Sequence, residues 1–544
     1  MKRIFASLLI LACLSSVTFG VIPAGAVWEV RTTGAQASGG GFCWTSLVNA
    51  TYKWTASASG TNEYYCEIAA GGDPSLVGSG SVTCDGNYNL STAGAVGSLA
   101  AGQHAFGDND KLGYTTPYVR LANGLDPDAM IARGRPGYVS YGAGGTDYSQ
   151  QANAQMSATD ICIVRGDTTQ VYRSGATKWA QDYDNNILHI TAGAGHTQGW
   201  FHVVSVDAND DAVLDRAAGT AGSSSGTGAV GGAFEFGGTL DDDFMEAGPA
   251  GTTMYIGGGN HTQLGETASR TGTSGSFYCF GYNASRGDNP IGTDRSLIDC
   301  GAYAFGGSNT NVSNCIFANL RFTGSGTSVF LGTIRKTQFF NLQSTCTNVS
   351  GSNCSAFSFE GWNVVVGCEG SVSSTGSTSA VFNSTAADCT YFGCYAHDSK
   401  NGFYSVAGSS LNCFNSVIDT CTTGINWASM TAAPIIANCT FWGNTTDVSI
   451  SAVTSPNQSL IVNNIFTGTS GIVGHPTSLI TAFGNVFNCT TPFNPGKSIF
   501  FNTFADPGLN APATGDFRIG TSDTNVYEQG VDVGYFTTAQ TYDE

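Results

Sequence analysis

The chain has 544 residues, of which 73 are glycine, 11% are charged and 41% are hydrophobic, and its formal net charge is −19. Long solvated helices need many charged residues and disordered chains contain few hydrophobic ones, so this composition argues against a helical bundle and against a disordered protein. The negative charge repels phosphate groups, and we therefore expect no nucleic-acid partner.

Residues 1–26 have the pattern of a cleaved secretory signal peptide. Lys2 and Arg3 precede an apolar stretch, 4–19, and three small residues at 24–26 fit a cleavage site. We therefore expect a secreted protein, located outside the cell or at its surface. A loose lipoprotein acylation box ending at Cys13 leaves lipoprotein processing open. No later stretch reaches about 18 apolar residues, so we expect no membrane span.

Residues 27–235 lack the repeat found further along the chain. Residues 27–42 form a short lead-in segment, and residues 43–144 predict a small β-module inserted after it. Within the module, residues 114–121 and 137–141 alternate as strands do, and turn-forming Gly, Asn and Asp residues separate such runs.

Residues 145–235 predict an N-terminal β cap with alternating strands such as 202–206. Asp207, Asn209 and Asp211 follow and imitate the start of a calcium-binding loop. The glycine and the final glutamate that such a loop requires are absent, so a hairpin turn is the better interpretation. We expect no metal site and no cofactor, and calcium stays an open alternative.

From residue 312 a short motif recurs, in which a small polar residue is followed by a small residue, any residue and a large apolar one. Its spacing is 21 to 26 residues, and the copies begin at Asn314, Thr337, Asn363, Asp388, Asn412, Asn438, Asn463 and Gly484. Leucine-rich repeats share this period, but their spaced leucines are absent. The repeat predicts an all-β solenoid of about 24 residues per coil, with stacked coils joined by parallel ladders.

Strand alternation predicts which motif positions face the core. If the fourth position points inward, the second also does, and the inner column then holds Cys315, Gln338, Val364, Cys389, Cys413, Cys439, Asn464 and Asn485. We interpret the cysteines of this column as small buried packing residues.

Sixteen cysteines follow Cys13, an even number for an exported protein in which disulfides can form. Cys346 and Cys354, eight residues apart across a polar loop, are the best candidate pair. No CxxC pair accompanies them, so we do not expect zinc.

Acidic residues are scarce in the coils, which narrows the search for a catalytic site. Aligning two coils on Gly402 and Gly424 stacks His397 over Asp419, about 5 Å apart, with Asp398 and Lys400 beside them. The four side chains His397, Asp398, Lys400 and Asp419 could supply an acid, a base and an electrostatic stabiliser. The alternative is that these polar residues form the coil corners.

The fifth motif position is expected to point outward and places Phe392 and Trp442 in one column, two coils apart. Exposed rings at such an interval can stack on the faces of sugars. Ordinary exposed aromatic residues are the alternative.

The repeat region resembles the right-handed parallel β-helix family, which includes pectate lyases, polygalacturonases and phage tailspikes. Stretches that look like the first coils and like the closing segment of such proteins are 252–260, 290–297, 311–322, 515–519 and 530–534. The resemblance covers residues 236–510 and implies that they form the solenoid and that residues 511–544 close it. Three further stretches, 28–34, 39–42 and 145–151, look like a lead-in that precedes β-helices in phage-like proteins.

Three functions are consistent with these features. The first is a secreted β-helix that binds polysaccharide along its long face without catalysis. The second is a polysaccharide lyase or glycoside hydrolase, although the catalytic sequence patterns of pectate lyases and polygalacturonases are missing; Gly474 and His475 stand without the upstream acids. The third is a phage-like adhesin or tailspike component. The expected partner is a polysaccharide or cell-surface glycan, and the protein is a monomer or a homotrimer.

Overall fold

The structure is a computed structural model that forms two compact units, Met1–Phe236 with Ala247–Tyr255 and Gly237–Glu246 with Ile256–Glu544. The residues that it describes are 26–43, 45–46, 54–66, 80–84, 88–90, 94–111, 116–121, 124, 139–143, 147–235, 251–262, 268–269, 277–284, 286, 288, 290–307, 315–332, 336–348, 351, 353–359, 361–385, 389–406, 411–428, 434–450, 459–475, 479–493, 498–500, 502–514 and 516–519. The predicted signal peptide lies outside this described part, except for Ala26, as does most of the predicted closing segment.

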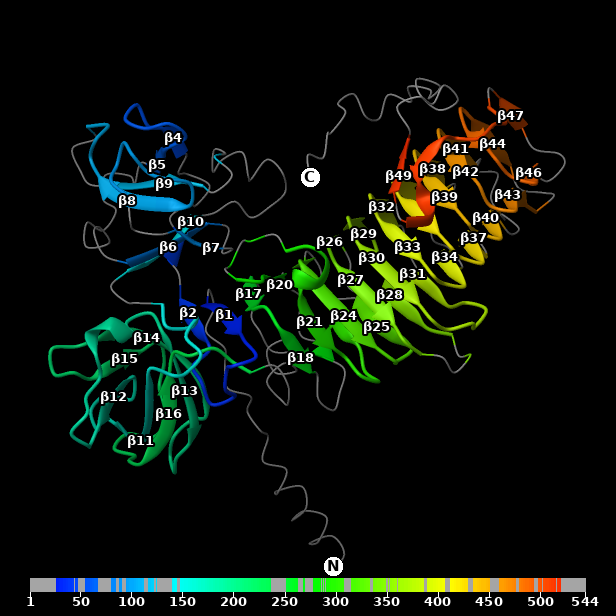
Figure 1. Cartoon of the computed structure of the whole chain (residues 1–544). Coiled ribbons are helices and arrows are strands. Elements are labelled where there is room, and N and C mark those ends of the chain that lie inside the picture. Colours follow the sequence, from blue (N-terminus) through cyan, green and yellow to red (C-terminus); the bar gives the residue numbers. More distant parts are fainter. Residues whose placement is uncertain are drawn as a thin grey trace, which may run out of the picture. The chain divides into compact units, whose positions relative to one another are not determined.

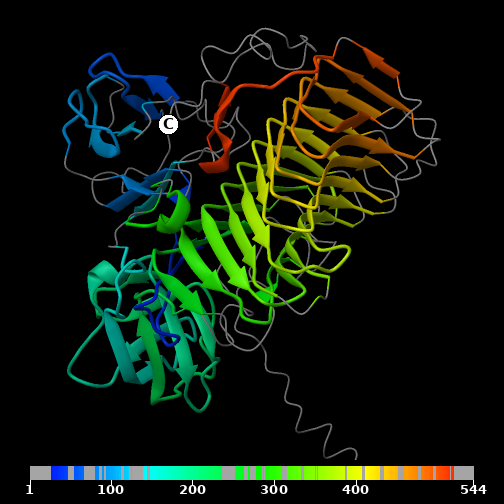
Figure 2. The same ribbon diagram turned by 45° about the vertical axis from the view of Figure 1, so that its right-hand side comes forward.

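The second unit is a parallel β-helix in which each coil contributes one strand to each of three sheets (Figures 1 and 2). Sheet A contains β20 (Phe277–Gly281), β23 (Ile316–Ala318), β26 (Thr337–Phe340), β29 (Asn363–Val366), β32 (Cys389–Phe392), β35 (Leu411–Phe414), β38 (Ile435–Ala437), β41 (Ser459–Val462), β44 (Ile480–Phe483) and β47 (Ser498–Phe500). Sheet B contains β18 (Asn260–Thr262), β21 (Ser296–Asp299), β24 (Leu320–Gly324), β27 (Gln343–Cys346), β30 (Glu369–Val372), β33 (Tyr395–His397), β36 (Val417–Asp419), β39 (Thr440–Trp442), β42 (Ile465–Phe466) and β45 (Val486–Phe487). Sheet C contains β19 (Ala268–Ser269), β22 (Phe305–Gly307), β25 (Ser328–Gly332), β28 (Ser355–Phe359), β31 (Ala380–Ser384), β34 (Asn401–Ser405), β37 (Thr423–Trp427), β40 (Thr446–Ile450), β43 (Ser470–Gly474) and β46 (Thr491–Phe493).

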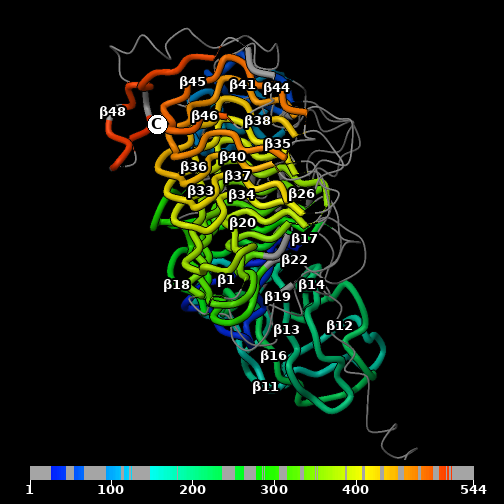
Figure 3. Tube along the Cα trace, turned by 90° about the vertical axis from the view of Figure 1, so that its right-hand side faces the viewer, coloured from blue at the N-terminus to red at the C-terminus, as the bar shows by residue number. Residues whose placement is uncertain are grey.

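Between β23 and β41, register partners in successive coils lie 22 to 26 residues apart. The predicted right-handed parallel β-helix of about 24 residues per coil is therefore confirmed, and Figure 3 shows the stacked coils as a tube. The recurring Asn and Gly residues have a direct cause: each corner from sheet A to sheet B needs one residue with a positive φ, which Asn and Gly adopt most readily. Those corner residues are Asn319, Asn341, Gly367, Gly393, Asn415, Asn438, Asn463 and Gly484.

The core of the β-helix is built from stacked aromatic rings and apolar side chains inside the coils. In sheet C, the rings of Phe357 and Phe382 lie 5.1 Å apart and those of Phe382 and Phe403 lie 4.7 Å apart, nearly parallel in both cases. Such pairs contribute about 0.5–1.5 kcal/mol beyond the area that they bury. At a corner in the later coils, Asn464 accepts a hydrogen bond from the backbone of Cys439, and Asn485 accepts one from Asn464, so an amide ladder joins the coils.

The predicted inner column is partly wrong. Cys315, Cys389 and Cys413 are buried as expected, but Gln338 and Val364 share an outward column, and Val364 is 39% exposed. In those two coils the strand begins one residue away from the assumed start, which turns every side chain to the opposite face.

The predicted shared column of Phe392 and Trp442 is also wrong. Phe392 lies on β32 of sheet A, whereas Trp442 lies on β39 of sheet B. The motif marks sheet A in the earlier coils, but from Asn438 onward the same letters mark the corner that leads into sheet B.

The first unit contains antiparallel sheets. Within 145–235, β11 (Met156–Ile163), β12 (Gln170–Arg173), β15 (Ala212–Leu214), β14 (Gly199–Val206), β13 (Ile187–Ala192) and β16 (Gly226–Val230) close into a barrel. The barrel encloses a core that includes Ile161, Phe201 and Val230. The turn from β14 to β15 is a hairpin, in which Asp207 accepts hydrogen bonds from the backbone of Asn209 and Asp211, so the hairpin interpretation of this loop is confirmed.

Two further four-stranded sheets occupy the predicted module at 43–144. One contains β3 (Thr45–Ser46), β10 (Val139–Ala143), β6 (Gly80–Cys84) and β7 (Tyr88–Leu90), and the other contains β4 (Trp54–Ala56), β5 (Tyr64–Cys66), β9 (Thr116–Arg120) and β8 (Gln103–Gly107). The lead-in forms the antiparallel pair β1 (Ala26–Val30) and β2 (Gly41–Cys43), and β17 is Thr252–Ile256. Short 3-10 turns occur at η2 (Gln181–Tyr183), η3 (Gly292–Asp294) and η4 (Pro512–Thr514). No helix of the described chain is both long enough and apolar enough to cross a membrane.

Candidate functional site

The outer face of sheet B carries two columns of outward side chains that run from coil to coil. The first column holds Leu297, Arg321, Gln343, Glu369, Tyr395, Val417 and Thr440. The second column holds Asp299, Thr323, Thr345, Ser371, His397, Asp419 and Trp442. Because parallel strands lie about 4.8 Å apart, neighbours within a column are close enough to interact.

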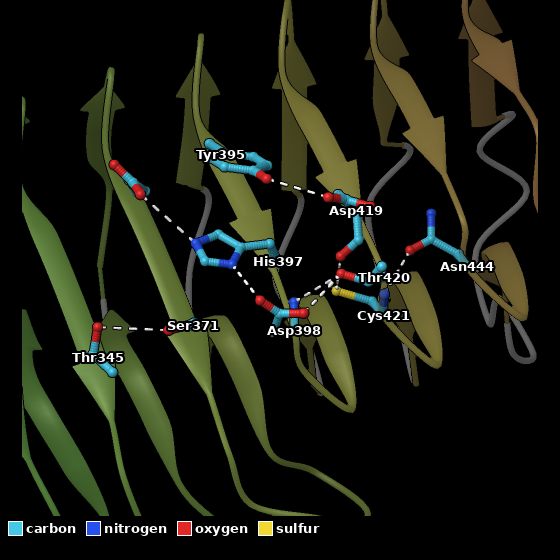
Figure 4. A network of polar contacts seen from close by, with 10 residues as sticks. Thr345, Ser371, Tyr395, His397, Asp398, Asp419, Thr420, Cys421 and Asn444 are labelled. Carbon is cyan, nitrogen blue, oxygen red and sulfur yellow. Dashed lines mark hydrogen bonds and ion pairs between the residues drawn. The ribbon is translucent and has the colours of Figure 1, made fainter. Parts of the chain in front are cut away.

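Figure 4 shows the polar network at the centre of this face. His397 and Asp419 are register partners on β33 and β36, so the stacking that the glycine alignment predicts is present. His397 lies between two carboxylates: its Nε2 is 3.7 Å from Glu369 Oε1, and its Nδ1 is 2.9 Å from Asp398 Oδ2. The His397 imidazole therefore bridges Glu369 on the preceding coil and Asp398, which directly follows β33.

This arrangement shifts the pKa of all three groups. Burial alone would lower the pKa of His397, but its contact with the Glu369 carboxylate and its hydrogen bond with Asp398 outweigh burial and raise it. The His397 imidazole lowers the pKa of Glu369, and the neighbouring Gln343 side chain acts in the same direction. The same imidazole lowers the pKa of Asp398, which also accepts a hydrogen bond from Thr420 at 2.9 Å. Both carboxyl groups are thus held in the ionised form.

Asp419 has the opposite environment. The Tyr395 hydroxyl donates to Asp419 Oδ2 at 3.2 Å, while Asp419 Oδ1 is buried and has no hydrogen-bond partner. Burial raises the pKa of Asp419, and the charge of Asp398 adds to the increase. Asp419 therefore keeps its proton to a higher pH than the neighbouring carboxyl groups of Glu369 and Asp398 do.

An aromatic contact packs the C-terminal segment against this network. The Tyr395 ring stacks on the His397 ring, with centroids 4.6 Å apart. The Phe517 ring makes an edge contact with Tyr395, with centroids 6.2 Å apart. Phe517 belongs to β49 (Asp516–Ile519), which pairs with β48 (Leu509–Ala511). The described part of the C-terminal segment thus reaches back along the coils as far as β33.

The structure separates Lys400 from the other predicted residues. Lys400 lies in the turn before β34, and its ammonium makes no ion pair or hydrogen bond with any side chain that the structure describes. Glu369 and Tyr395 are the residues that the glycine alignment missed. Both stand two positions after a corner glycine, Gly367 and Gly393, so an alignment on these corner glycines, instead of on Gly402 and Gly424, would have found them.

Cys346 and Cys354 lie side by side in the core as free thiols, with 3.1 Å between their sulfur atoms. The hydrogen bond from Cys346 lowers the pKa of Cys354 to about 7. The predicted disulfide between them stays a prediction. Among the described residues, no three His, Cys, Asp or Glu side chains gather as metal ligands would.

Comparisons with solved structures found matches of low sequence identity and low TM-score. The chain is similar to the crystal structure of pectate lyase Pel9A, with 11% identity and a TM-score of 0.37 over 52% of this chain and 84% of that chain. It is also similar to the catalytic domain of a GH87 alpha-1,3-glucanase in complex with nigerose, with 13% identity and a TM-score of 0.24 over 65% and 86% of the two chains. No protein-family model and no curated protein sequence matches the chain.

Proposed function

We propose that the protein binds a polysaccharide along the outer face of sheet B and hydrolyses its glycosidic bonds between Asp398 and Asp419. The observation that carries this proposal is a pair of carboxyl groups on adjacent coils in different environments: Asp398 accepts hydrogen bonds from His397 and Thr420, whereas Asp419 has one buried oxygen without a partner. These environments lower the pKa of Asp398 and raise that of Asp419. Glycosidases need such a pair, in which one acid is protonated and the other is ionised at the same pH.

The spacing of the two groups supports this chemistry. Asp398 is one position beyond His397, which is the register partner of Asp419, so the two residues lie on neighbouring coils, whose strands are about 4.8 Å apart, and are offset by one position. Glycosidases use carboxyl separations of about 5 to 10 Å. A sugar chain that lies along the columns would pass over both groups.

In the proposed reaction, neutral Asp419 donates its proton to the glycosidic oxygen as the bond to the anomeric carbon breaks. Ionised Asp398 takes a proton from the water molecule whose oxygen bonds to that carbon. One water is consumed and two hydroxyl ends form. His397 and Thr420 hold Asp398 in the ionised form, and Tyr395 orients the Asp419 carboxyl group.

Binding without cleavage is the second candidate function, and Trp442 favours it. This half-buried ring follows Asp419 in the same outward column, where it offers a stacking surface to a sugar one coil beyond the carboxyl pair. Binding through Trp442 requires no catalysis.

The test compares the wild-type protein with Asp419→Asn and Trp442→Ala on a panel of polysaccharides, and follows both new reducing ends and binding to immobilised polymer. Asp210→Asn, in an exposed hairpin turn of the first unit, is the matched control for loss of one carboxylate. We expect Asp419→Asn to remove cleavage but to retain binding, and Trp442→Ala to weaken binding. Binding by the wild-type protein with no release of reducing ends would support the second function, and unchanged cleavage by Asp419→Asn would refute the assigned acid.

A further inference from the structure

Two arginines lie on the outer face of sheet B, on the coils that precede the polar network. Arg321 stands in the first outward column of β24, two strands before Glu369. Arg295 immediately precedes β21 and is only 6% exposed, and its Nη2 donates to Asn341 Oδ1. The two guanidinium groups therefore lie at the same end of the face. Gln343 separates Arg321 from Glu369 in the first outward column.

These guanidinium groups are not neutralised by a bonded carboxylate of the described chain. Arg295 Nε and Nη1 and Arg321 Nε are buried without a hydrogen-bond partner, and Arg321 forms no hydrogen bond or ion pair with any described residue. The nearest carboxylate in the columns, Glu369, is already engaged by His397 and Gln343.

The two positive charges also act on each other. Burial lowers the pKa of Arg295, and the charge of Arg321 lowers it further, whereas Glu369 opposes both effects. A buried guanidinium without a bonded acceptor is costly, because it has lost hydration without gaining hydrogen bonds. The donors of a guanidinium group match the oxygens of a carboxylate or a sulfate ester. An anion at this place would supply the acceptors that the chain itself does not.

We propose that Arg295 and Arg321 form an anion subsite, and that the polysaccharide cleaved at Asp398 and Asp419 carries a carboxylate or sulfate group on a sugar bound there. This inference rests on the proposed function and names its substrate class. Arg321 contacts the anion, and Arg295 lies behind it and adds positive charge. The subsite is two strand spacings from Glu369 and four from Asp419, about 10 and 19 Å along the columns, so it holds a sugar several units away from the cleaved bond.

The net charge of −19 does not oppose this subsite, because charges beyond about 10 Å are largely screened at ordinary ionic strength. The local charge at the subsite differs from the net charge of the whole chain. Two guanidinium groups occupy β21–β24, where the outward columns contain one carboxylate, that of Asp299. Glu369 and Asp398 stay ionised further along the face and would repel anionic groups placed over them. A polymer with scattered anionic groups therefore fits this face better than a uniformly charged one.

The test uses chondroitin sulfate, its desulfated form, its carboxyl-reduced form and the polymer that lacks both groups, together with gellan and carboxyl-reduced gellan. Binding is measured by surface plasmon resonance with the full chain in the Asp419→Asn background, which separates binding from cleavage. Arg321→Gln removes the proposed contact. Arg165→Gln removes one exposed guanidinium from the first unit and is the matched control. Thermal melting of each variant reports whether it is folded.

We expect an anionic polymer to bind at least about tenfold more tightly than its neutral counterpart. Arg321→Gln, but not Arg165→Gln, should abolish that difference. The desulfated and carboxyl-reduced forms identify which group is recognised. Equal binding of charged and neutral forms, no binding of any anionic polymer, or an unchanged difference in Arg321→Gln would overturn the subsite. Binding that depends on Arg321 without cleavage by the wild-type protein would instead contradict the proposed hydrolysis and leave the subsite standing.

Discussion

Asp447 offers a test of how the β-helix core tolerates a charge. This residue on β40 has no exposed surface, and it accepts hydrogen bonds from Asn444 at 3.0 Å and from the backbone of Gly468 at 2.9 Å. The Cys489 sulfur lies 3.8 Å away. Burial raises the pKa of Asp447 from 3.8 to about 7, even though these hydrogen bonds oppose the increase. The folded protein therefore holds a proton here that the unfolded chain loses.

The sign of the effect follows from that difference. Because the folded pKa is the higher one, the stability contributed by the neutral carboxyl group is fully present below the unfolded pKa and is lost as the pH rises through the folded value. A shift of about three pKa units corresponds to about 4 kcal/mol over the whole window. Between pH 5 and pH 8, about 3 kcal/mol of this contribution should disappear.

Urea unfolding at pH 5, 6, 7 and 8 measures this loss when wild-type protein is compared with Asp447→Asn, which stays neutral throughout. We expect the wild-type protein to lose about 3 kcal/mol more unfolding free energy than the variant over this range. Asp210→Asn, at an exposed turn, should behave like the wild-type protein. If Asp447→Asn and the wild-type protein show the same dependence on pH, the carboxyl group is ionised in the folded core and the reasoning is wrong.

Three further predictions concern the core, the site and the corner ladder. Phe382→Ala should lower the unfolding free energy by about 3–5 kcal/mol because it opens a cavity between stacked rings, whereas Phe392→Ala on the outer face of sheet A should cost clearly less; equal losses in urea unfolding would contradict the inward stack. Glu369→Gln should lower the pKa of His397, measured by NMR titration, because one of the two carboxylates that raise it is gone; an unchanged pKa would mean that Asp398 alone sets it. Asn464→Ala should cost about 1–3 kcal/mol in urea unfolding because it leaves the backbone amide of Cys439 without its acceptor, and a neutral effect would show that the ladder adds no stability.

The sequence predicts the length of each coil but not the residue at which each strand begins. The 24-residue period and the Asn or Gly at each corner follow from backbone conformation, which local sequence reveals directly. The facing of Gln338 and the sheet that holds Trp442 depend on where each strand begins, and a shift of one residue reverses a strand without changing the period.

The sequence likewise predicts one part of the candidate site and misses another. The stacking of His397 over Asp419 was predictable because the two coils have equal length around Gly402 and Gly424. The coil before them is longer between sheets B and C, because Glu369 and Ala380 are 11 residues apart where their register partners Tyr395 and Asn401 are 6 apart, so Glu369 could not be aligned by counting from those glycines. The opposite pKa shifts at Asp398 and Asp419 depend on burial and on hydrogen bonds that cross between coils, which no single stretch of sequence encodes.

The most direct test of the account is the release of reducing ends from a polysaccharide panel by wild-type protein and by Asp419→Asn, at equal concentration and with Asp210→Asn in parallel. The account predicts that at least one polymer is shortened by the wild-type protein and by Asp210→Asn, and that Asp419→Asn loses this activity by a factor of about 100 or more, as expected for removal of a general acid. Equal activity of Asp419→Asn and the wild-type protein, or the absence of cleavage across the panel, would contradict hydrolysis on the outer face of sheet B.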